Sequence, residues 1–551
     1  MLLSGEGSPA DDWCKKQGIF GINPWIGACN RMIFRPQQRL MMISIAGGCN
    51  SMLKSWFDRD ELPNLASIWS GSVSGSLRSS QPANASAAWA SMMTGRTTPH
   101  HGVYDPEFLA FDRKTIQQNH IGRIMVPHLW QILSRAGRSV VSIHAPLSFG
   151  IKAEGVRILA ASDSPVRGSR TTSDLALPKS IACNWSQSRL WNRRPKSVDE
   201  AVGVAERHKL HNAALADMAE FADKQGDWAL MHVNFQDLDG LQHAFWPELE
   251  VDATAILARP EWLSIVRDTL RSLDQSVGRL AELAEKQKAG LMVVSDHGFG
   301  PCRALVNVNG ILRIHGIQRR QSLGGAILHH SRRAFGTLAE RLQAGRKSYQ
   351  SIDLSHACDW SSSLAFAPFG QHSGLIYLTD KARAHEGRAE RATQEVAEIF
   401  RLIAEPESGE PVFSDVIPVA NRWGIDPVAT GWPDIIAIPA DGYEPRANWN
   451  HKEKVRLFRP DTNQPGTHYA DGVVALKGSG LESGRISRCQ VQDIAPTILK
   501  WLDVQPPESM EGRIIGTQAE NSIYQPHIRP NSGRKVIVST RQSNSSEIPL
   551  Y

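Results

Sequence analysis

Two short motifs and one separate histidine supply residue types that bind divalent metal ions. Asp239 and His243 are four positions apart just after an apolar segment, Asp296 and His297 follow another apolar segment, and His468 lies nearer the C-terminus. Carboxylate and imidazole groups are good ligands for zinc and similar ions. Because these residues are more than one tetrahedral ion needs, the pattern predicts two neighbouring ions, one polarising a substrate and the other activating the attacking group.

Each motif alone also has an ordinary explanation. An Asp-x-x-x-His pair on a helix is usually a surface pair, and an Asp-His pair after a strand is often a capped turn. The combination of three separate segments is what favours a metal site. Asp237, which lies two positions before Asp239, is interpreted as an outer-shell or surface acid rather than as a ligand.

The segments that carry these residues have the pattern of an α/β protein. Residues 40–46 form an apolar run that ends at Gly47 and Gly48, which is typical of a strand buried on both faces of a parallel sheet. Further strands are predicted at 139–144, 228–235, 290–294 and 472–477, and helices at 129–137, 270–285 and 493–501. This alternation, with polar residues after the strands, predicts a doubly wound, mostly parallel sheet with helices on both faces.

The sequence also suggests four parts of the chain. Residues 1–38 are predicted to be an N-terminal extension, 39–310 and 451–520 the catalytic core, 311–450 an insertion or cap beside the site, and 521–551 a mobile tail. The insertion has basic helical stretches and loops rich in Gly and Pro. No strand in it is predicted to end in metal-ligand residue types.

The composition is that of an ordinary globular protein. The 551 residues are 41% hydrophobic and 21% charged, and the net charge is +5, which argues against nucleic acid as a partner. Seven scattered cysteines without a C-x-x-C pair are interpreted as free thiols, and no segment resembles a secretory leader or an apolar membrane span. We therefore expect a cytoplasmic protein without a membrane partner, and the sequence leaves the oligomeric state open.

A series of ordered motifs gives a more specific indication. They are Leu62-Pro-Asn-Leu65, Ala88-Trp-Ala-Ser-Met-Met-Thr-Gly95, Pro99-His-His-Gly102, residues 130–146, residues 239–246, Ser295-Asp-His-Gly298, Gly466-Thr-His468 and Asp493-Ile-Ala-Pro-Thr-Ile-Leu499. In this order and spacing they resemble the alkaline phosphatase superfamily, and within it the type I phosphodiesterase and nucleotide pyrophosphatase-like proteins. The resemblance covers most of residues 39–310 and 455–515.

The resemblance implies a role for each candidate ligand. Asp239, His243 and His468 correspond to the ligands of one metal ion, and Asp296 and His297 correspond to part of the ligand set of the other. It therefore implies two divalent ions, zinc or alternatively manganese. The implied substrate is a small phosphate ester or a nucleotide-like molecule.

Two positions depart from the family pattern. The family has the aspartate of an Asp-Gly pair just after the first strand, where this chain has Ala46, and a Thr or Ser nucleophile four residues before the motif tryptophan, where it has Ala85. Ala46 is therefore interpreted as a vacated ligand position and Ala85 as the vacated nucleophile position. Ser86 is the nearest hydroxyl, but one step along a helix start turns a side chain by roughly 100°. Its ordinary role would be that of a helix N-cap.

Three functions are compatible with these observations. The first is a metal-dependent hydrolase of phosphate diesters or pyrophosphates with weak or absent activity, because a methyl group cannot attack phosphorus and a metal-activated water would have to replace the nucleophile. The second is a binding or scaffold pseudoenzyme on the same fold. The third is a deliberately inactivated form of an active hydrolase. A sulfatase is disfavoured, because Ala85-Ser-Ala-Ala-Trp89 lacks the Cys or Ser followed by x-Pro-x-Arg of that group.

Overall fold

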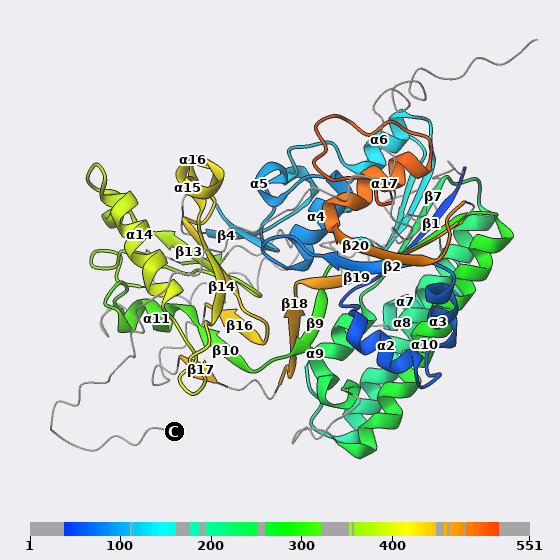
Figure 1. Ribbon diagram of the computed structural model, residues 1–551, viewed down its shortest axis with the longest axis horizontal. Coiled ribbons are helices and arrows are strands. Elements are labelled where there is room, and N and C mark those ends of the chain that lie inside the picture. Colours follow the sequence, from blue (N-terminus) through cyan, green and yellow to red (C-terminus); the bar gives the residue numbers. More distant parts are fainter. Residues whose placement is uncertain are drawn as a thin grey trace, which may run out of the picture.

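A large central sheet organises the protein, which is described here by a computed structural model (Figure 1). The structure describes residues 38–110, 113, 115–160, 177–187, 193–250, 259–320, 352–354, 358–447, 457–459, 463–478 and 480–516. The sheet has eight strands in the order β20 (Gly484–Gln490), β2 (Val73–Arg78), β19 (Asp471–Lys477), β8 (Gly290–Val294), β1 (Leu40–Ile45), β7 (Leu230–Phe235), β5 (Val140–Ile143) and β6 (Val156–Leu159). Only β19 runs antiparallel to its neighbours in this sheet.

The centre of the sheet is buried on both faces. Every residue of β1, β7 and β8 is buried, as expected for continuous apolar strands in the middle of a parallel sheet. Side chains of β1 alternate between the two faces, so that Met41 and Ile43 join one hydrophobic cluster while Leu40 and Met42 join the other. Two layers of helices must therefore cover the sheet.

One layer contains α2 (Asn50–Phe57), α3 (Pro63–Ser70), α7 (Lys179–Gln187), α8 (Val198–Lys224), α9 (Asp237–Leu249) and α10 (Pro260–Lys286). The opposite layer contains α4 (Ala85–Thr94), α6 (Leu129–Arg135) and α17 (Ile494–Trp501), with the short helices η1 (Ile121–Arg123), η2 (Val491–Asp493) and α5 (Thr98–His101) on the segments beside them. Helix α10 illustrates the pattern, because Val266, Leu270, Leu273 and Val277 recur at helical spacing and are buried. The predicted doubly wound α/β fold is confirmed.

A second layered region lies beside the central sheet in Figure 1. Its four-stranded sheet has the order β12 (Ala365–Phe366), β13 (Gly374–Leu378), β15 (Ile435–Pro439) and β14 (Phe413–Pro418). Its helices are α11 (Val308–Ile314), α13 (Asp380–Arg383), α14 (Arg388–Arg401), α15 (Val419–Trp423) and α16 (Pro427–Thr430). Most of this region falls within the predicted insertion.

Three small sheets connect the two regions. They are β11 (Ile352–Asp353), β4 (Thr115–Gln118) and β3 (Glu107–Leu109); β16 (Tyr443–Arg446), β10 (Ala304–Asn307) and β17 (Phe458–Arg459); and the two-stranded ribbon of β18 (Gly466–Tyr469) and β9 (Gly298–Pro301). Phe108 and Ile116 of the β3–β4 hairpin pack in one cluster with Tyr377 and Ile436 of the insertion sheet. The core thus contributes a hairpin to the second region, and the domain boundaries at 310 and 450 stay a prediction.

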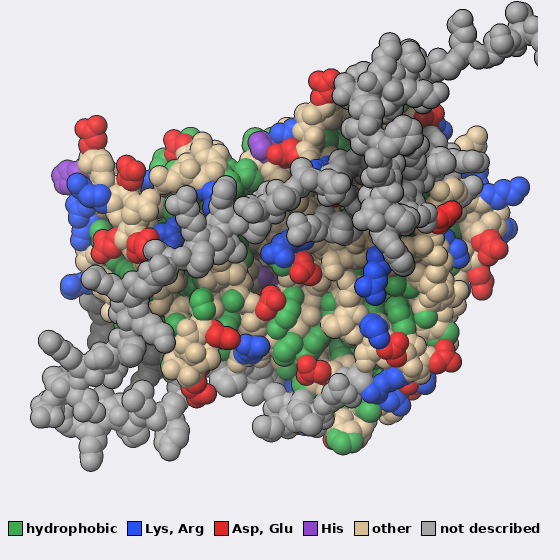
Figure 2. All heavy atoms as spheres, in the orientation of Figure 1, with side chains coloured by type: hydrophobic (Ala, Val, Ile, Leu, Met, Phe, Trp, Pro, Cys, Tyr) green, Lys and Arg blue, Asp and Glu red, His purple; other side chains and the backbone are tan. Residues whose placement is uncertain are grey.

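Several other predictions concern the surface and the chain ends. The tail at 521–551 and nearly all of the extension at 1–38 lie outside the described residues. The described helices include none with the length and apolar character that a bilayer span requires. Where Figure 2 draws side chains in colour, basic and acidic side chains are interspersed on this face.

Candidate metal centre

The carboxyl ends of β7 and β8 lead directly into the candidate ligands. Helix α9 begins two residues after β7 ends, and the i, i+4 spacing brings Asp239 Oδ1 to 3.6 Å from His243 Nε2. Ser295, Asp296 and His297 follow β8 in the same way. Since β7 and β8 both flank β1 in the sheet, their ends are close in space.

The β9–β18 ribbon adds the last candidate from far along the chain. Strand β9 starts immediately after His297, and its Phe299 pairs with His468 of β18. His468 Nε2 lies 2.9 Å from Asp239 Oδ1, and the His468 ring lies 3.7 Å from the His297 ring between centroids. The structure therefore brings Asp239, His243 and His468 together, as the sequence predicts.

Asp296 and His297 lie beside this group. His297 Nε2 is 3.9 Å from Asp239 Oδ1 and 3.6 Å from Asp296 Oδ2. Asp239, His297 and His468 each offer a ligand atom, and these atoms lie within 4.8 Å of one another. The candidate residues thus form one continuous centre.

Backbone carbonyl groups determine which ring nitrogen of His243 and of His297 is available to bind a metal ion. His243 Nδ1 lies 2.9 Å from the Gly466 carbonyl oxygen, and His297 Nδ1 lies 3.1 Å from that of Gly298. A carbonyl oxygen only accepts, so Nδ1 carries the hydrogen in both rings and Nε2 keeps its lone pair. Both rings are oriented as metal-ligating histidines usually are.

Buried polar atoms without partners indicate that a cation fits here. Within the described part of the chain, both carboxyl oxygens of Asp296 and Nε2 of His297 are buried and have no hydrogen-bond partner. Leaving such groups unpaired in the interior costs free energy, which coordination to a divalent ion would recover. The donor set suits zinc and chemically similar ions.

The charge states of the cluster also suit cation binding. Burial alone would raise the pKa of Asp239, but neighbouring His243 and His468 hold that pKa well below its usual range. Burial, together with the repulsion of nearby histidines, lowers the pKa values of His468 and His243. Burial raises the pKa of Asp296, and the negative charge of Asp239 adds to the rise. Uncharged imidazoles beside a carboxylate are ready to bind a metal ion without first losing protons.

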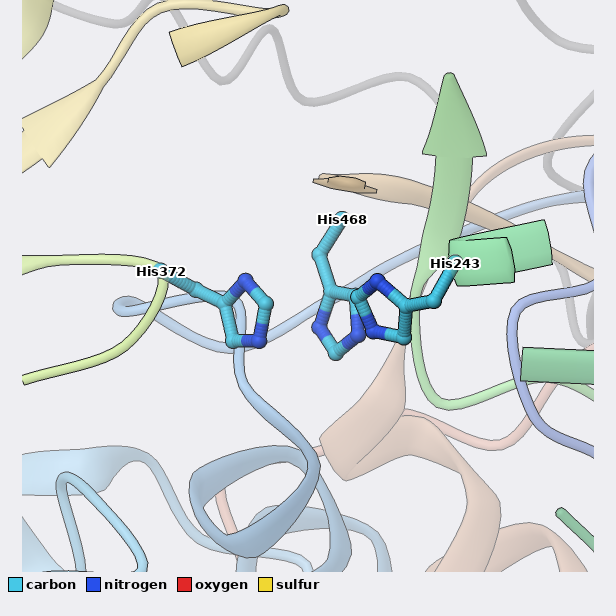
Figure 3. A group of neighbouring side chains, drawn as sticks. All are labelled: His243, His372 and His468. Atoms are coloured by element: carbon cyan, nitrogen blue, oxygen red, sulfur yellow. The ribbon is translucent and has the colours of Figure 1, made fainter. Parts of the chain in front are cut away.

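One residue of the centre was missed by the sequence analysis. His372 lies between β12 and β13 of the insertion, and its ring stacks on that of His468 with 3.6 Å between centroids and 5° between planes. Figure 3 shows His372 approaching from its own loop toward His468 and His243. Ligand atoms of these three histidines lie within 4.8 Å of one another. The nearby sequence Gln371-His372-Ser373 matches no metal-binding motif, so only the tertiary contact reveals it.

Ala46 lies in the tight turn after β1, close to the start of α9. Its N–H donates to the Phe235 carbonyl oxygen at the end of β7, at 2.9 Å. The next residue, Gly47, has φ of 79°, and a Cβ atom there would lie 2.3 Å from Gln242 Oε1 and 3.4 Å from Asp239 Cα. The turn therefore packs closely on α9, the helix that carries Asp239 and His243. Its side chain at position 46 is only a methyl group.

Ala85 is the first residue of α4, and Ser86 is the second. The interpretation of Ser86 as the N-cap is wrong. The cap is Asn84, whose Oδ1 accepts from the Ala87 N–H at 3.0 Å and whose Nδ2 donates to the Tyr104 carbonyl oxygen at 2.7 Å. Asparagine is a strongly preferred cap, so a count of cap propensities from the sequence would have found it.

Asp237 is also not a surface acid. It is fully buried, and its two carboxyl oxygens accept from His208 Nδ1 at 3.0 Å and from His211 Nδ1 at 2.7 Å, both on α8. Burial alone would raise the pKa of Asp237, but His211 and His208 lower it. Asp237 therefore ties α9 to α8 at the point where α9 begins.

One protein family and several solved structures are similar to this chain. The model of the type I phosphodiesterase/nucleotide pyrophosphatase family matches residues 40–471. Phosphonoacetate hydrolase from Sinorhizobium meliloti 1021, solved with phosphonoacetate, is similar at a TM-score of 0.52 and 13% identity, covering 85% of this chain and 96% of that one. Human ectonucleotide pyrophosphatase/phosphodiesterase 5 is similar at a TM-score of 0.48 and 13% identity, with the same coverage of 85% and 96%. No curated protein matched.

Proposed function

The chain belongs to the type I phosphodiesterase/nucleotide pyrophosphatase family of the alkaline phosphatase superfamily, and from that premise we propose that it is a metal-dependent phosphoester hydrolase with little or no turnover. One observation carries this proposal: some positions of the centre hold metal-ligand side chains, and others hold alanine. Asp239, His243 and His468 are present and close together, whereas Ala46 and Ala85 offer only methyl groups.

The intact group supports binding of one divalent ion, zinc or manganese. Asp239 and the Nε2 atoms of His243 and His468 are short-range neighbours, which is the arrangement that tetrahedral zinc sites use. When bound, a divalent ion in this family of sites polarises phosphoryl oxygens and stabilises the leaving group. Asp296 and His297 remain for a second ion, but Ala46 supplies no third donor, so we propose that this second site is weak.

The proposed ligand is a small phosphate ester or nucleotide-like molecule. The family description and the phosphonate bound to the fold-sharing phosphonoacetate hydrolase both support an anionic phosphorus group as the bound moiety. Ala85 provides no oxygen that could attack it. A binding protein that never turns over is the second candidate, and the same two alanines favour it.

Counting bound metal tests the proposal. We expect the purified apo-protein to bind one zinc ion tightly in equilibrium dialysis, with a second ion at least about tenfold weaker. His243→Ala should remove the tight ion, while His297→Ala should leave it in place, because only His243 belongs to the complete group. The zinc-loaded protein should also hydrolyse an aryl phosphodiester slowly.

Two results would contradict the proposal. Failure of the unaltered chain to bind zinc or manganese would remove its metal dependence. Rapid turnover by the unaltered chain would show that Ala46 and Ala85 do not limit the reaction.

A further inference from the structure

The ring of His468 is held differently from the other two imidazoles among the candidate ligands. Nδ1 of His243 and Nδ1 of His297 each donate to a backbone carbonyl oxygen. In the part of the chain that the structure describes, Nδ1 of His468 is buried and has no hydrogen-bond partner. Its Nε2 lies 2.9 Å from Asp239 Oδ1. One contact through one nitrogen does not fix the plane of a ring, so packing has to fix it.

Two imidazole rings supply that packing. The His468 ring lies 3.7 Å from that of His297 with 17° between planes, and 3.6 Å from that of His372 with 5° between planes. A nearly parallel ring at such a distance lies directly over one face, and two rings cannot occupy the same face. His297 of the core and His372 of the insertion therefore cover opposite faces of His468. Figure 3 shows His372 reaching His468 from its own loop.

Glu444 holds the His372 ring in this position. Nδ1 of His372 lies 2.8 Å from Glu444 Oε2, and the backbone N–H of His372 donates to Glu444 Oε1 at 3.1 Å. The backbone of His372 has φ of 64°, a left-handed conformation that is uncommon outside glycine. The side chain of His372 is 9% exposed. The ring is thus fixed inside the protein by a side chain and by the shape of its own loop.

The same carboxylate is connected to the strand that carries His468. Glu444 is buried in β16 and accepts a hydrogen bond from the hydroxyl of Thr467, the residue before His468 in β18. Arg446 forms an ion pair with Glu444 at 3.2 Å. Burial alone would raise the pKa of Glu444, but His372 and Arg446 hold that pKa below its usual range. One charged group therefore fixes the position of His372 relative to the strand of His468.

We propose that His372 is a positioning residue, through which the insertion keeps the ring of His468 in the plane that directs Nε2 toward Asp239. The stacked ring does for His468 what a carbonyl hydrogen bond does for a metal-ligating histidine in general. Parallel rings at this distance cannot both direct lone pairs at one ion, so His372 acts through His468 and is not itself a ligand. This inference rests on the proposed function, because it takes His468 as a metal ligand.

The test compares zinc affinity in four proteins by competition with a chromophoric chelator. His372→Asn tolerates the left-handed backbone but has no ring, whereas His372→Phe keeps a flat ring without nitrogen atoms. His385→Asn is the matched control, because His385 is an exposed histidine of the same insertion. We expect His372→Asn to weaken zinc binding about threefold to tenfold, the worth of an aromatic contact. His372→Phe and His385→Asn should stay within about twofold of the unaltered chain.

The orientation of His468 can also be measured without metal. Histidine that is isotope-labelled at the Cε1 carbon gives one NMR signal per ring, and the His468 signal is the one missing from His468→Asn. This signal should be single and sharp in the unaltered chain and in His372→Phe. It should be broadened or doubled in His372→Asn, because the ring then samples a second orientation. A purely structural contribution of His372 would lower the thermal unfolding midpoint and leave this signal sharp.

Each possible result decides between the two proposals. Equal zinc affinity of His372→Asn and the unaltered chain, or equally weak binding by His372→Asn and His372→Phe, would overturn the positioning role and keep the proposed metal site. No zinc binding by the unaltered chain would overturn the metal site, and the His468 signal would still decide whether His372 fixes that ring.

A further variant covers the case in which a substitution at position 372 prevents folding. Glu444→Gln keeps the His372 ring but weakens its hydrogen bonds, because a neutral amide is a poorer acceptor than a carboxylate. It should change the zinc affinity and the His468 signal in the same direction as His372→Asn, by a smaller amount. A folded Glu444→Gln protein without either change would overturn the inference.

Discussion

The two halves of the centre are built on the same sheet but hold very different side chains. On one side, α9 and β18 bring Asp239, His243 and His468 to within hydrogen-bond or near-ligand distances. Asp296 and His297 lie on the other side, and the two positions that the family pattern predicts to complete that side, Ala46 and Ala85, carry only methyl groups. The fold is continuous through both sides, but the side chains at positions 46 and 85 carry no donor atom.

This difference shows that backbone and side-chain requirements are separable. The turn at Gly47 still fits closely against Gln242 and Asp239, and Asn84 still caps α4. These contacts stabilise the fold whether or not phosphorus chemistry takes place, so they do not depend on which side chains stand at positions 46 and 85. The same architecture can therefore support a hydrolase or a silent binding protein.

Restoring the depleted half should produce the largest effect. We expect the combined change Ala46→Asp and Ala85→Thr to raise hydrolysis of an aryl phosphodiester at least about a thousandfold, and by more than the product of the single changes. An attacker without its ion is weak, and an ion without an attacker has little to activate. The assay compares the unaltered chain, the two single variants and the double variant with zinc or manganese supplied. Each rate is corrected for the metal content of the same sample.

Two outcomes would contradict the roles that we assign to positions 46 and 85. If the unaltered chain is as fast as the double variant, position 85 is not the nucleophile position. If the double variant carries two ions and stays inert, the defect lies in substrate choice or in the insertion.

The central sheet and most candidate ligands could be predicted from the sequence alone. Continuous apolar strands such as 40–45 need no tertiary information, and Asp239, Asp296 and His468 stand in motifs of fixed spacing. His372 could not be predicted, because its position depends on how the insertion packs on β18. The burial of Asp237 likewise depends on tertiary packing. Its partners His208 and His211 lie on α8, and nothing in the sequence around Asp237 reveals that α8 packs there.

Acid should destabilise the scaffold beneath the depleted half. His232 of β7 is bonded to Ser44 of β1 at 2.8 Å and packs against Trp89 of α4. Burial lowers the pKa of His232 to about 3, and burial with the neighbouring His232 lowers that of His128 to about 3. Because the unfolded chain takes up these protons at an ordinary histidine pKa near 6.5, it gains stability relative to the folded state as the pH falls.

Each of these histidines should therefore lower the free energy of unfolding by about 1.4 kcal/mol per pH unit at most, between about pH 6.5 and pH 3. Urea denaturation of the metal-free protein at a series of pH values measures this slope. The slope should become smaller in His232→Gln, which carries no titrating ring. An unfolding free energy that stays constant from pH 7 to pH 5 would show that these rings are not held neutral by burial.

The smallest expected effects distinguish two neighbouring residues at the start of α4. Asn84→Ala removes the cap to Ala87 and the hydrogen bond to Tyr104, so it should lower the free energy of unfolding by about 1 to 2 kcal/mol. Ser86→Ala should change it by less than about 0.5 kcal/mol, because Ser86 is not the cap. The same variant should leave residual phosphodiester hydrolysis unchanged, since the second helical position points away from the direction of the first. A clear loss of hydrolysis in Ser86→Ala, at unchanged stability and zinc content, would instead identify Ser86 as the attacking group and show that the depleted half still holds a nucleophile.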